Sequence, residues 1–319
     1  MTRVLVTGGC GFVGTNLVSY LMDHSNWSIN VIDDLSEGKY EYLKAIDNYN
    51  KDRIQFFQGD IRDEGDVEKA MAGCGSVVHL AARTDVISSI NDPFDDADVN
   101  ILGTINMLEC ALREEVERFV FASSAAPLGD QEQPVHENKV PSPLSPYGAS
   151  KLAGEGYCSA YSGSHGLTTV ALRFSNVYGP NSWHKGSAVS LFIKQILDGR
   201  TPVIYGSGEQ TRDLVHSDDI SQAIYLSLTK SLSSKYELFQ LGTGSETSVN
   251  DLYSIIEDKL NEEGMEVPKA IYGKERAGEI FRSYCDISRA KNILGFQPSI
   301  NIEEGIADTV KWFLENYRK

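Results

Sequence analysis

The chain has 319 residues and a hydrophobic content of 41%, enough to bury the core of one large α/β unit or of two closely joined domains. Its formal net charge of -16 argues against a nucleic-acid partner, because such binding needs a clustered basic surface. The five cysteines form no Cys-x-x-Cys pair and the six histidines no His-x-x-x-His pair, so we expect no disulfide framework and no metal site. No leader-like or membrane-length apolar stretch appears, which predicts a cytoplasmic protein without a membrane partner.

Short β-branched runs alternate with helical patterns through the first half of the chain. Strands are expected at residues 3–8, 29–33, 54–60, 76–82, 116–124 and 167–179. Helices are expected between them at residues 14–24, 66–73, 100–115 and 147–163. This alternation predicts βαβ units and an α/β fold of the Rossmann type, a doubly wound parallel sheet with helices on both faces.

The alternation loosens after about residue 175, where turn signals such as "YGPN" and "YGSGEQ" separate shorter elements. We therefore expect a dinucleotide-binding domain made of residues 1–174 and a returning segment at about 213–243. Residues 175–212 and 244–319 are expected to form a smaller C-terminal α/β substrate domain. No flexible linker separates the two parts, which predicts a tight interface between them.

Gly8, Gly11 and Gly14 have G-x-x-G-x-x-G spacing between the first predicted strand and the helix that follows it. These glycines allow a tight turn and a close approach of the backbone to a ligand. A pyrophosphate would then sit at the helix N-terminus, beside Phe12 and Val13, where unpaired N–H groups favour anions. A simple glycine-rich turn has the same spacing, so the triplet needs further support.

That support comes from Asp33, which ends the second predicted strand about twenty residues beyond the triplet. A carboxylate there accepts hydrogen bonds from both ribose hydroxyls and repels a 2′-phosphate. Because Asp34 rather than an arginine follows it, the sequence predicts NAD rather than NADP as the cofactor. Asp60 and Ile61 are expected to flank the adenine, although Asp60 is equally suited to cap a helix. Small residues after the fourth strand should also approach the cofactor; these are Leu80, Ala81 and Ala82.

A catalytic pair is expected at Tyr147 and Lys151, four residues apart on one face of a predicted helix. A nearby ammonium and the positive charge of an oxidised nicotinamide would stabilise the tyrosine phenolate. Ser124, at the end of a strand, could hydrogen-bond the same substrate hydroxyl. Together these groups would remove a proton from an alcohol while a hydride leaves its carbon.

These segments resemble the extended short-chain dehydrogenase/reductases, particularly the NAD-dependent nucleotide-sugar epimerases and dehydratases. The resemblance runs along almost the whole chain and includes "LRFSNVYGP", "GEQTRDLVHSDDIS" and "RAGEIFRSYCDISRAKNILGFQP". It implies that Tyr147 is the base, that Lys151 lowers its pKa and binds the nicotinamide ribose, and that Ser124 aids proton transfer. It further implies cofactor contacts by Asn100 and Phe174. The substrate contacts that it implies involve Asn176, Tyr205, Arg212, Arg276, Glu279 and Ser283.

The family divides at the corner after Ser124. The resemblance implies an Asp-Glu pair there in 4,6-dehydratases and a Glu in sugar-acid decarboxylases, whereas this chain has Ala125 and Ala126. It therefore predicts an NAD-dependent 4-epimerase that acts on a UDP-hexose through a transient 4-keto sugar. One departure concerns the sugar pocket, because Pro127 and Leu128 replace the usual Val-Tyr.

The small Ser283 leaves room for an N-acetyl group, which favours UDP-GlcNAc/UDP-GalNAc while UDP-glucose/galactose stays open. Arg83, Arg282 and Lys185 would suit a C6 carboxylate, or are simply solvated surface charges. The alternatives are a UDP-glucuronate 4-epimerase, a nucleotide-sugar 4-reductase and a non-catalytic NAD-binding regulator. A homodimer through helices at residues 100–113 and 147–161 is also expected, although packing within one chain explains their apolar pattern equally well.

Overall fold

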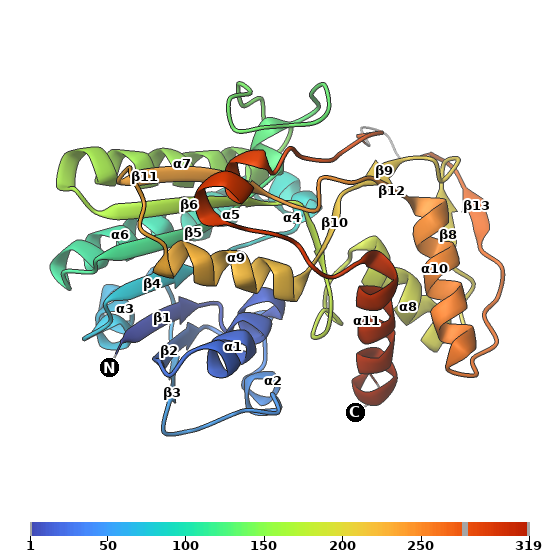
Figure 1. Ribbon diagram of the computed structural model, residues 1–319, viewed down its shortest axis with the longest axis horizontal. Coiled ribbons are helices and arrows are strands. Elements are labelled where there is room, and N and C mark those ends of the chain that lie inside the picture. Colours follow the sequence, from blue (N-terminus) through green and yellow to red (C-terminus); the bar gives the residue numbers. More distant parts are fainter. Residues whose placement is uncertain (1, 276–279, 318–319) are drawn as a thin grey trace.

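The computed structural model describes residues 2–275 and 280–317. At its centre lies a seven-stranded sheet in the order β11-β6-β5-β4-β1-β2-β3 (Figure 1). All neighbouring strands in it are parallel. The strand order reverses between β1 and β4, the position where doubly wound folds bind their ligands. The predicted Rossmann-type fold is thereby confirmed. The strands are β1 (Arg3–Thr7), β2 (Ser28–Asp33), β3 (Ile54–Gln58), β4 (Ser76–His79), β5 (Arg118–Ser124), β6 (Thr168–Phe174) and β11 (Tyr236–Leu241).

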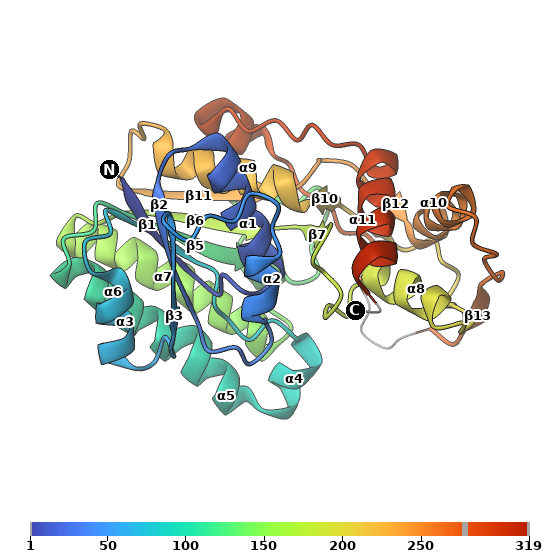
Figure 2. The ribbon, with the colours of Figure 1, turned by 90° about the horizontal axis from the view of Figure 1, so that it is seen from below.

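Each face of the sheet has its own buried core, because successive side chains of a strand point to opposite faces. In β1, Val4 and Val6 face a core shared with α1 and α9, whereas Leu5 faces a core shared with α3, α6 and α7. Figure 2 shows these two groups of helices on opposite sides of the sheet. The helices are α1 (Phe12–His24), α2 (Tyr40–Lys44), α3 (Glu64–Met71), α6 (Gly103–Arg113), α7 (Pro146–His165) and α9 (Ser217–Thr229).

Short elements follow β4 and β5, at the carboxyl end of the sheet. The chain after β4 forms α4 (Val86–Asn91), α5 (Pro93–Ala97) and the π-helix η1 (Asp98–Leu102), which runs directly into α6. The corner after β5 is the 3₁₀ turn η2 (Ala126–Leu128). These elements border the ends of the strands, where the predicted cofactor and catalytic residues lie.

A smaller unit adjoins the carboxyl end of the sheet and has a third buried core (Figure 1). Short strand pairs, β7 with β10, β8 with β13 and β9 with β12, connect its helices. Its strands are β7 (Asn176–Tyr178), β8 (Val203–Tyr205), β9 (Thr211–Arg212), β10 (Leu214–His216), β12 (Thr247–Ser248) and β13 (Ile271–Gly273). Its helices are α8 (Ala188–Leu197), α10 (Val249–Glu262) and α11 (Ile302–Asn316).

The chain also returns to the large sheet after residue 284. Ala290 and Leu294, in the π-helix η3 (Ala290–Leu294), and the nearby Phe296 are fully buried in the core that α1 and α9 cover. The predicted returning segment, 213–243, did not include these residues. The division of the chain into two domains accordingly stays a proposal, with residues 285–296 added to the sheet-bearing part.

Within residues 2–275 and 280–317, no helix is long and apolar enough to cross a membrane. The same part of the chain contains no group of three or more His, Cys, Asp or Glu side chains placed to hold a metal ion. All five cysteines are free and buried.

Candidate active site

The glycine turn after β1 is packed so closely that side chains would collide in it. Gly8 has a φ of +65°, and a Cβ on it would lie 2.9 Å from the Ala81 backbone nitrogen. A Cβ on Gly14 would lie 2.2 Å from the Gly8 carbonyl oxygen. Gly11 precedes α1 and has no side chain to cap the first turn, where Phe12 and Val13 begin the helix. The turn thus presents backbone N–H groups and the positive end of a helix, which suits a pyrophosphate.

Asp33 is fixed at the end of β2, next to this turn. Its buried carboxylate accepts hydrogen bonds from the backbone N–H groups of Cys10 and Leu35, each at 2.9 Å. Burial raises the pKa of the Asp33 carboxyl, and these two hydrogen bonds act against that rise. Asp34 turns away and accepts from the Ser36 backbone N–H and hydroxyl. Asp33 therefore has the place and the acceptor atoms that a ribose diol requires.

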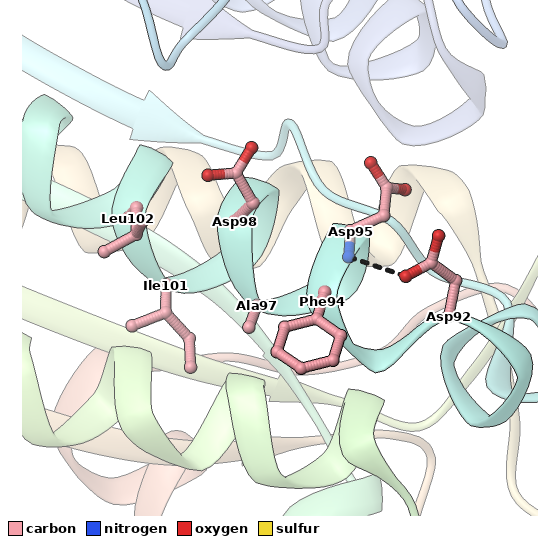
Figure 3. A pocket seen from close by; sticks show the side chains of 7 residues that line it. All are labelled: Asp92, Phe94, Asp95, Ala97, Asp98, Ile101 and Leu102. Atoms are coloured by element: carbon pink, nitrogen blue, oxygen red, sulfur yellow. Dashed lines mark hydrogen bonds between the residues drawn. The ribbon is translucent and has the colours of Figure 1, made fainter.

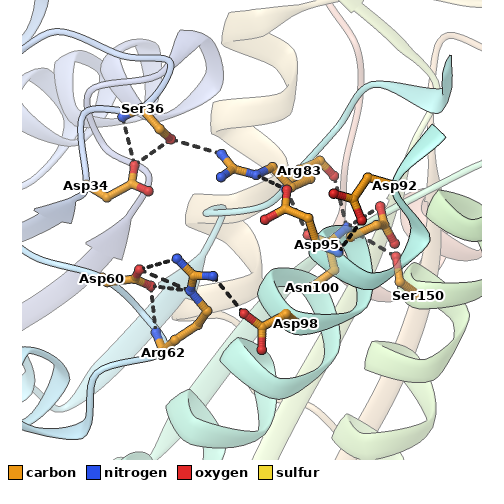
Figure 4. A network of polar contacts seen from close by, with 11 residues as sticks. Asp34, Ser36, Asp60, Arg62, Arg83, Asp92, Asp95, Asp98, Asn100 and Ser150 are labelled. Atoms are coloured by element: carbon orange, nitrogen blue, oxygen red, sulfur yellow. Dashed lines mark hydrogen bonds and ion pairs between the residues drawn. The ribbon is translucent and has the colours of Figure 1, made fainter. Parts of the chain in front are cut away.

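The residues predicted to flank the adenine, and those of the loop after β4, lie around the glycine turn. Asp60 is held by Arg62, which also pairs with Asp98 (Figure 4). The Ile61 side chain is buried in the core, which leaves its backbone to face a ligand. After β4, the Thr7 hydroxyl accepts from the backbone N–H groups of Leu80 and Ala81 and thus fixes the loop that ends in Ala82. The sequence analysis did not include Arg62 or Thr7, whose roles depend on contacts with distant segments.

Arg83 links three segments around the predicted cofactor site. Its side chain donates to Asp95 Oδ2 at 2.9 Å and to Ser36 Oγ at 3.1 Å (Figure 4). Its backbone N–H donates to Asn100 Oδ1, and its carbonyl accepts from Asn100 Nδ2. Asn100 lies in the π-helix η1, a helical irregularity that often marks functional sites. The predicted cofactor residue Asn100 therefore holds the loop on which Arg83 lies.

The structure brings Ser124, Tyr147 and Lys151 together at the ends of β5 and α7. The Ser124 hydroxyl accepts from the Ala126 backbone N–H at 3.2 Å and is close enough to the Tyr147 phenol to lower its pKa. Lys151 is 4% exposed, and its ammonium donates to the Ala122 carbonyl at 2.9 Å and lies 6.0 Å from the centre of the Tyr147 ring. Burial raises the pKa of Tyr147 to about 12 and lowers the pKa of Lys151 to about 8. A further positive charge beside Tyr147 is thus needed to form its phenolate at neutral pH, and oxidised nicotinamide carries one.

The local sequence explains why α7 starts at this place. The Ser145 hydroxyl caps the helix by accepting from the Gly148 backbone N–H, and Pro146 occupies the first turn. A Cβ on Gly148 would lie 2.7 Å from the Ala126 carbonyl, and one on Gly154 would lie 2.3 Å from the Phe121 ring. The helix therefore packs directly on β5 and η2, which fixes Tyr147 and Lys151 relative to Ser124.

A buried ion pair one turn further along α7 anchors the helix to the sheet. Glu155 accepts two hydrogen bonds from the Arg173 guanidinium on β6, each at 2.7 Å, and a third from the Ser123 hydroxyl on β5. Both charged side chains are almost inaccessible to solvent. The sequence analysis missed this pair, although the four-residue spacing of Glu155 from Lys151 was a usable signal.

The corner after Ser124 carries small and apolar side chains. Ala125 and Ala126 follow directly, and the Ala125 backbone N–H donates to the carbonyl of Phe174. Pro127 is buried, and Leu128 is 1% exposed and belongs to the core under the sheet. Pro127 and Leu128, the departure from Val-Tyr noted in the sequence, therefore pack into the protein core.

The predicted substrate residues lie on the short strands of the smaller unit. Asn176 is exposed on β7, Tyr205 ends β8 and Arg212 lies on β9. Ser283 is aligned with this group because its carbonyl accepts from the Asp213 backbone N–H at 2.8 Å. Two further predicted residues, Arg276 and Glu279, lie outside the described residues.

Asp213 is a residue of this region that the sequence analysis missed. Its fully buried carboxylate accepts from the Thr243 backbone N–H and hydroxyl, from the Gly244 N–H and from Cys285. It thus joins three segments far apart in the sequence and fixes the segment that carries Ser283. In the sequence it is simply an acid in "TRDLVHSDD", a stretch rich in acids, with no spacing signal of its own.

Comparisons with known proteins identify the family. Residues 4–242 match the model of the NAD dependent epimerase/dehydratase family. A relative named "Putative UDP-glucose 4-epimerase" from Methanocaldococcus jannaschii is 39% identical over 99% of both chains. Two solved structures are similar over 98% or more of both chains. They are the UDP-N-acetylglucosamine 4-epimerase of Methanobrevibacter ruminantium in complex with UDP-N-acetylmuramic acid (33% identity, TM-score 0.89) and the UDP-glucose 4-epimerase of Thermus thermophilus in complex with NAD (34%, TM-score 0.87).

The chain therefore belongs to the NAD dependent epimerase/dehydratase family, as its resemblance to the extended short-chain dehydrogenase/reductases implied. The predictions of NAD as cofactor and of an NAD-dependent epimerase enzyme are confirmed at this level. The glycine turn, the fixed Asp33 carboxylate and the Lys151 ammonium are the features of this chain that fit the dinucleotide. The similar proteins are named for different UDP-sugars, so these comparisons do not assign the sugar of the substrate.

Proposed function

We propose that this protein interconverts the two C4 epimers of a UDP-hexose. The observation that carries the proposal is the assembly of Ser124, Tyr147 and Lys151 next to a corner formed by Ala125 and Ala126. The first three side chains suffice for moving a proton to and from a sugar hydroxyl. The two alanines supply neither the acid nor the base that elimination of water requires, which favours epimerisation over dehydration.

In the proposed reaction, NAD would be held by the glycine turn, Asp33 and Lys151, and it would supply the hydride chemistry at C4 of the sugar. Tyr147, as the phenolate, takes the proton of the C4 hydroxyl and gives it back when the 4-keto sugar is reduced. Ser124, whose hydroxyl lies beside Tyr147, would hydrogen-bond the same sugar hydroxyl and orient it. Lys151 stabilises the phenolate by its charge, and its contact with the Ala122 carbonyl holds it in place.

We favour UDP-GlcNAc/UDP-GalNAc as the substrate pair, with UDP-glucose/galactose as a second pair. Ser283 has a small side chain, and the hydrogen bond from the Asp213 N–H to its carbonyl fixes its segment beside β9 and Arg212. A small residue there excludes neither an N-acetyl group nor a hydroxyl at C2 of the sugar. The proposal thus rests on the absence of a steric barrier.

A specific observation supports UDP-glucuronate as a further candidate. Lys185 precedes α8 and donates to the Thr84 hydroxyl at 3.0 Å, which brings its ammonium to the loop that follows β4. Its charge acts on Lys151 and lowers the pKa of that residue. Lys185 is therefore near enough to the catalytic group to pair with a C6 carboxylate of a bound sugar. Arg282 is less suitable because it already pairs with Glu246.

A panel of UDP-sugars tests these proposals. Purified protein would be incubated separately with UDP-GlcNAc, UDP-glucose and UDP-glucuronate, and the C4 epimers resolved by proton NMR. We expect epimers with no net NADH, and the fastest conversion with UDP-GlcNAc. A 4-keto-6-deoxy product would instead identify a dehydratase, and NADH formed in proportion to sugar would overturn the epimerase proposal. A requirement for added NADH or NADPH would identify a 4-reductase.

We also propose that the protein is a homodimer. Phe94, Ile101 and Leu102 line a pocket on α5 and η1 (Figure 3), with a volume of about 600 Å³. Phe94 is 86% exposed and Leu102 is 58% exposed, which is costly for apolar side chains unless a partner covers them. Light scattering should give twice the chain mass, and Phe94→Asp should shift it toward one chain. A wild-type protein that stays monomeric at micromolar concentration would overturn this proposal.

A further inference from the structure

A buried carboxylate lies behind the catalytic pair. Asp96 is in α5, which packs against α7, and it is 2% exposed. Burying a carboxylate costs several kcal/mol unless charges and hydrogen bonds compensate it. Neither the predicted cofactor residues nor the predicted catalytic residues include it, so its presence needs an explanation.

Its hydrogen bonds connect two parts of the site. Asp96 Oδ1 accepts from Asn100 Nδ2 at 3.0 Å, and the nearby Ser150 hydroxyl donates to the Tyr147 carbonyl at 3.0 Å. Ser150 lies between Tyr147 and Lys151 in sequence and is 3.1 Å from Asn100 Nδ2 (Figure 4). Asn100 in turn holds the backbone of Arg83. The carboxylate therefore joins the loop beside the predicted cofactor site to the catalytic helix.

Its charge acts on both catalytic residues. The Lys151 ammonium lowers the pKa of the Asp96 carboxyl, against the rise that burial causes. In return, Asp96 raises the pKa of both Lys151 and Tyr147. The other charged groups that act here are Asp95 on α5, Glu155 on α7 and Lys185 before α8, and burial keeps His79 on β4 neutral.

We propose that Asp96 is a positioning residue for the reaction: its buried carboxylate holds Asn100, and through Asn100 also Ser150, between α5 and the catalytic helix α7, and it supplies a negative charge in the same buried region as Lys151. The inference rests on the proposed epimerase function. Asp96 itself touches no reacting atom. It acts through Lys151, whose charge supports the Tyr147 phenolate, and through Asn100, which holds the loop of Arg83.

The test is Asp96→Asn, which keeps an acceptor for Asn100 and removes the charge. The pH profile of kcat/KM should move to lower pH on both its acid and its alkaline limb, by about one pH unit, because both Tyr147 and Lys151 lose a nearby negative charge. Asp258→Asn is the matched control, since it removes one exposed charge on α10 and should leave the profile in place. Asp96→Glu should restore the wild-type profile.

A second measurement does not depend on activity. Carbon-13 NMR of protein labelled at its lysines shows one Cε signal for each lysine. The signal that is absent from the spectrum of Lys151→Arg belongs to Lys151, and its shift with pH gives the pKa of that residue. We expect this titration in the wild type near pH 8, and at lower pH in Asp96→Asn. If wild-type protein epimerises no UDP-sugar, the proposed function fails, and this titration still tests Asp96.

Two results would overturn the role of Asp96. The first is a Lys151 pKa that is the same in Asp96→Asn as in the wild type. The second is a pH profile of kcat/KM that keeps its position while the rate or the melting temperature falls, which is the result expected for a residue with only a structural role. Should Asp96→Asn not fold, Asp96→Ser takes its place, because a serine also removes the charge and still offers an oxygen to Asn100.

Discussion

The cofactor side and the sugar side of this site are built in different ways. On the cofactor side, backbone contacts leave no room for change: Gly8 and Gly14 lie against other backbone atoms, and two N–H groups fix Asp33. On the sugar side, short strands and the segment beside β9 carry side chains that are partly or fully exposed, such as Asn176 on β7 and Ser283 on that segment. The first arrangement defines one chemistry, and the second leaves the choice of sugar to a few replaceable side chains.

The strongest test of the cofactor side is Tyr147→Phe. Loss of the hydroxyl removes the base, so kcat should fall by about 10²-fold to 10⁴-fold. Bound NAD and the melting temperature should stay close to wild type, because the ring and its packing remain. Tyr157→Phe, on the exposed side of the same helix, is the control and should keep its activity. NMR of the C4 epimers measures both, and near-normal turnover by Tyr147→Phe would mean that another group is the base.

Gly14→Ala tests whether the glycine turn is as crowded as the structure indicates. The added methyl group would lie 2.2 Å from the Gly8 carbonyl oxygen, so the turn must shift, at a cost of about 1–3 kcal/mol in the free energy of unfolding. Purified variant protein should also contain less NAD, measured by absorbance after denaturation.

The matched control for this variant is Gly163→Ala, which places a methyl group in open space on α7. There the substitution should stabilise the protein by about 0.5–1 kcal/mol, because glycine in a helix interior costs conformational entropy. Equal effects of the two substitutions, measured by urea unfolding, would contradict the contrast between a crowded turn and an open helix face.

The same contrast governs what the sequence could reveal. The Gly8 to Gly14 turn, Asp33 and the Tyr147–Lys151 pair were predictable because each depends on spacing within a single strand–helix unit. Asp96, the Glu155–Arg173 pair and Asp213 were not, because their partners come from distant segments and a buried acid has the same sequence appearance as a solvated one. The inward packing of Leu128 escaped prediction for the same reason, since only the fold determines which side of the corner faces the core.

Ser283→Tyr tests the sugar side. A bulky side chain at this position should reduce kcat/KM for UDP-GlcNAc relative to UDP-glucose by about tenfold to a hundredfold, the usual range for a steric change in a pocket. Bound NAD should not change, since Ser283 lies on the segment paired with β9 and not at the glycine turn. Competition between the two sugars in one NMR tube measures the ratio directly. An unchanged ratio would mean that another residue sets the choice at C2.

The smallest expected effect is a pH dependence that all sugars share. Burial lowers the pKa of Lys151 to about 8, so above that pH the ammonium loses its proton and kcat/KM should fall about tenfold per pH unit, whichever UDP-sugar is used. This loss of activity is not caused by unfolding. The pKa of Lys151 in the folded state lies below the ordinary value of 10.5, so between these two pH values the unfolded chain binds more protons than the folded one. The contribution of Lys151 to the free energy of unfolding therefore rises with pH in this range. Lys151→Arg should lower the rate and move the alkaline limb to higher pH, since arginine keeps its charge. If the pH of the alkaline limb differed from one UDP-sugar to another, the titrating group would lie on the sugar side and would not be Lys151. The contrast between a fixed cofactor side and an adjustable sugar side would then not hold at Lys151.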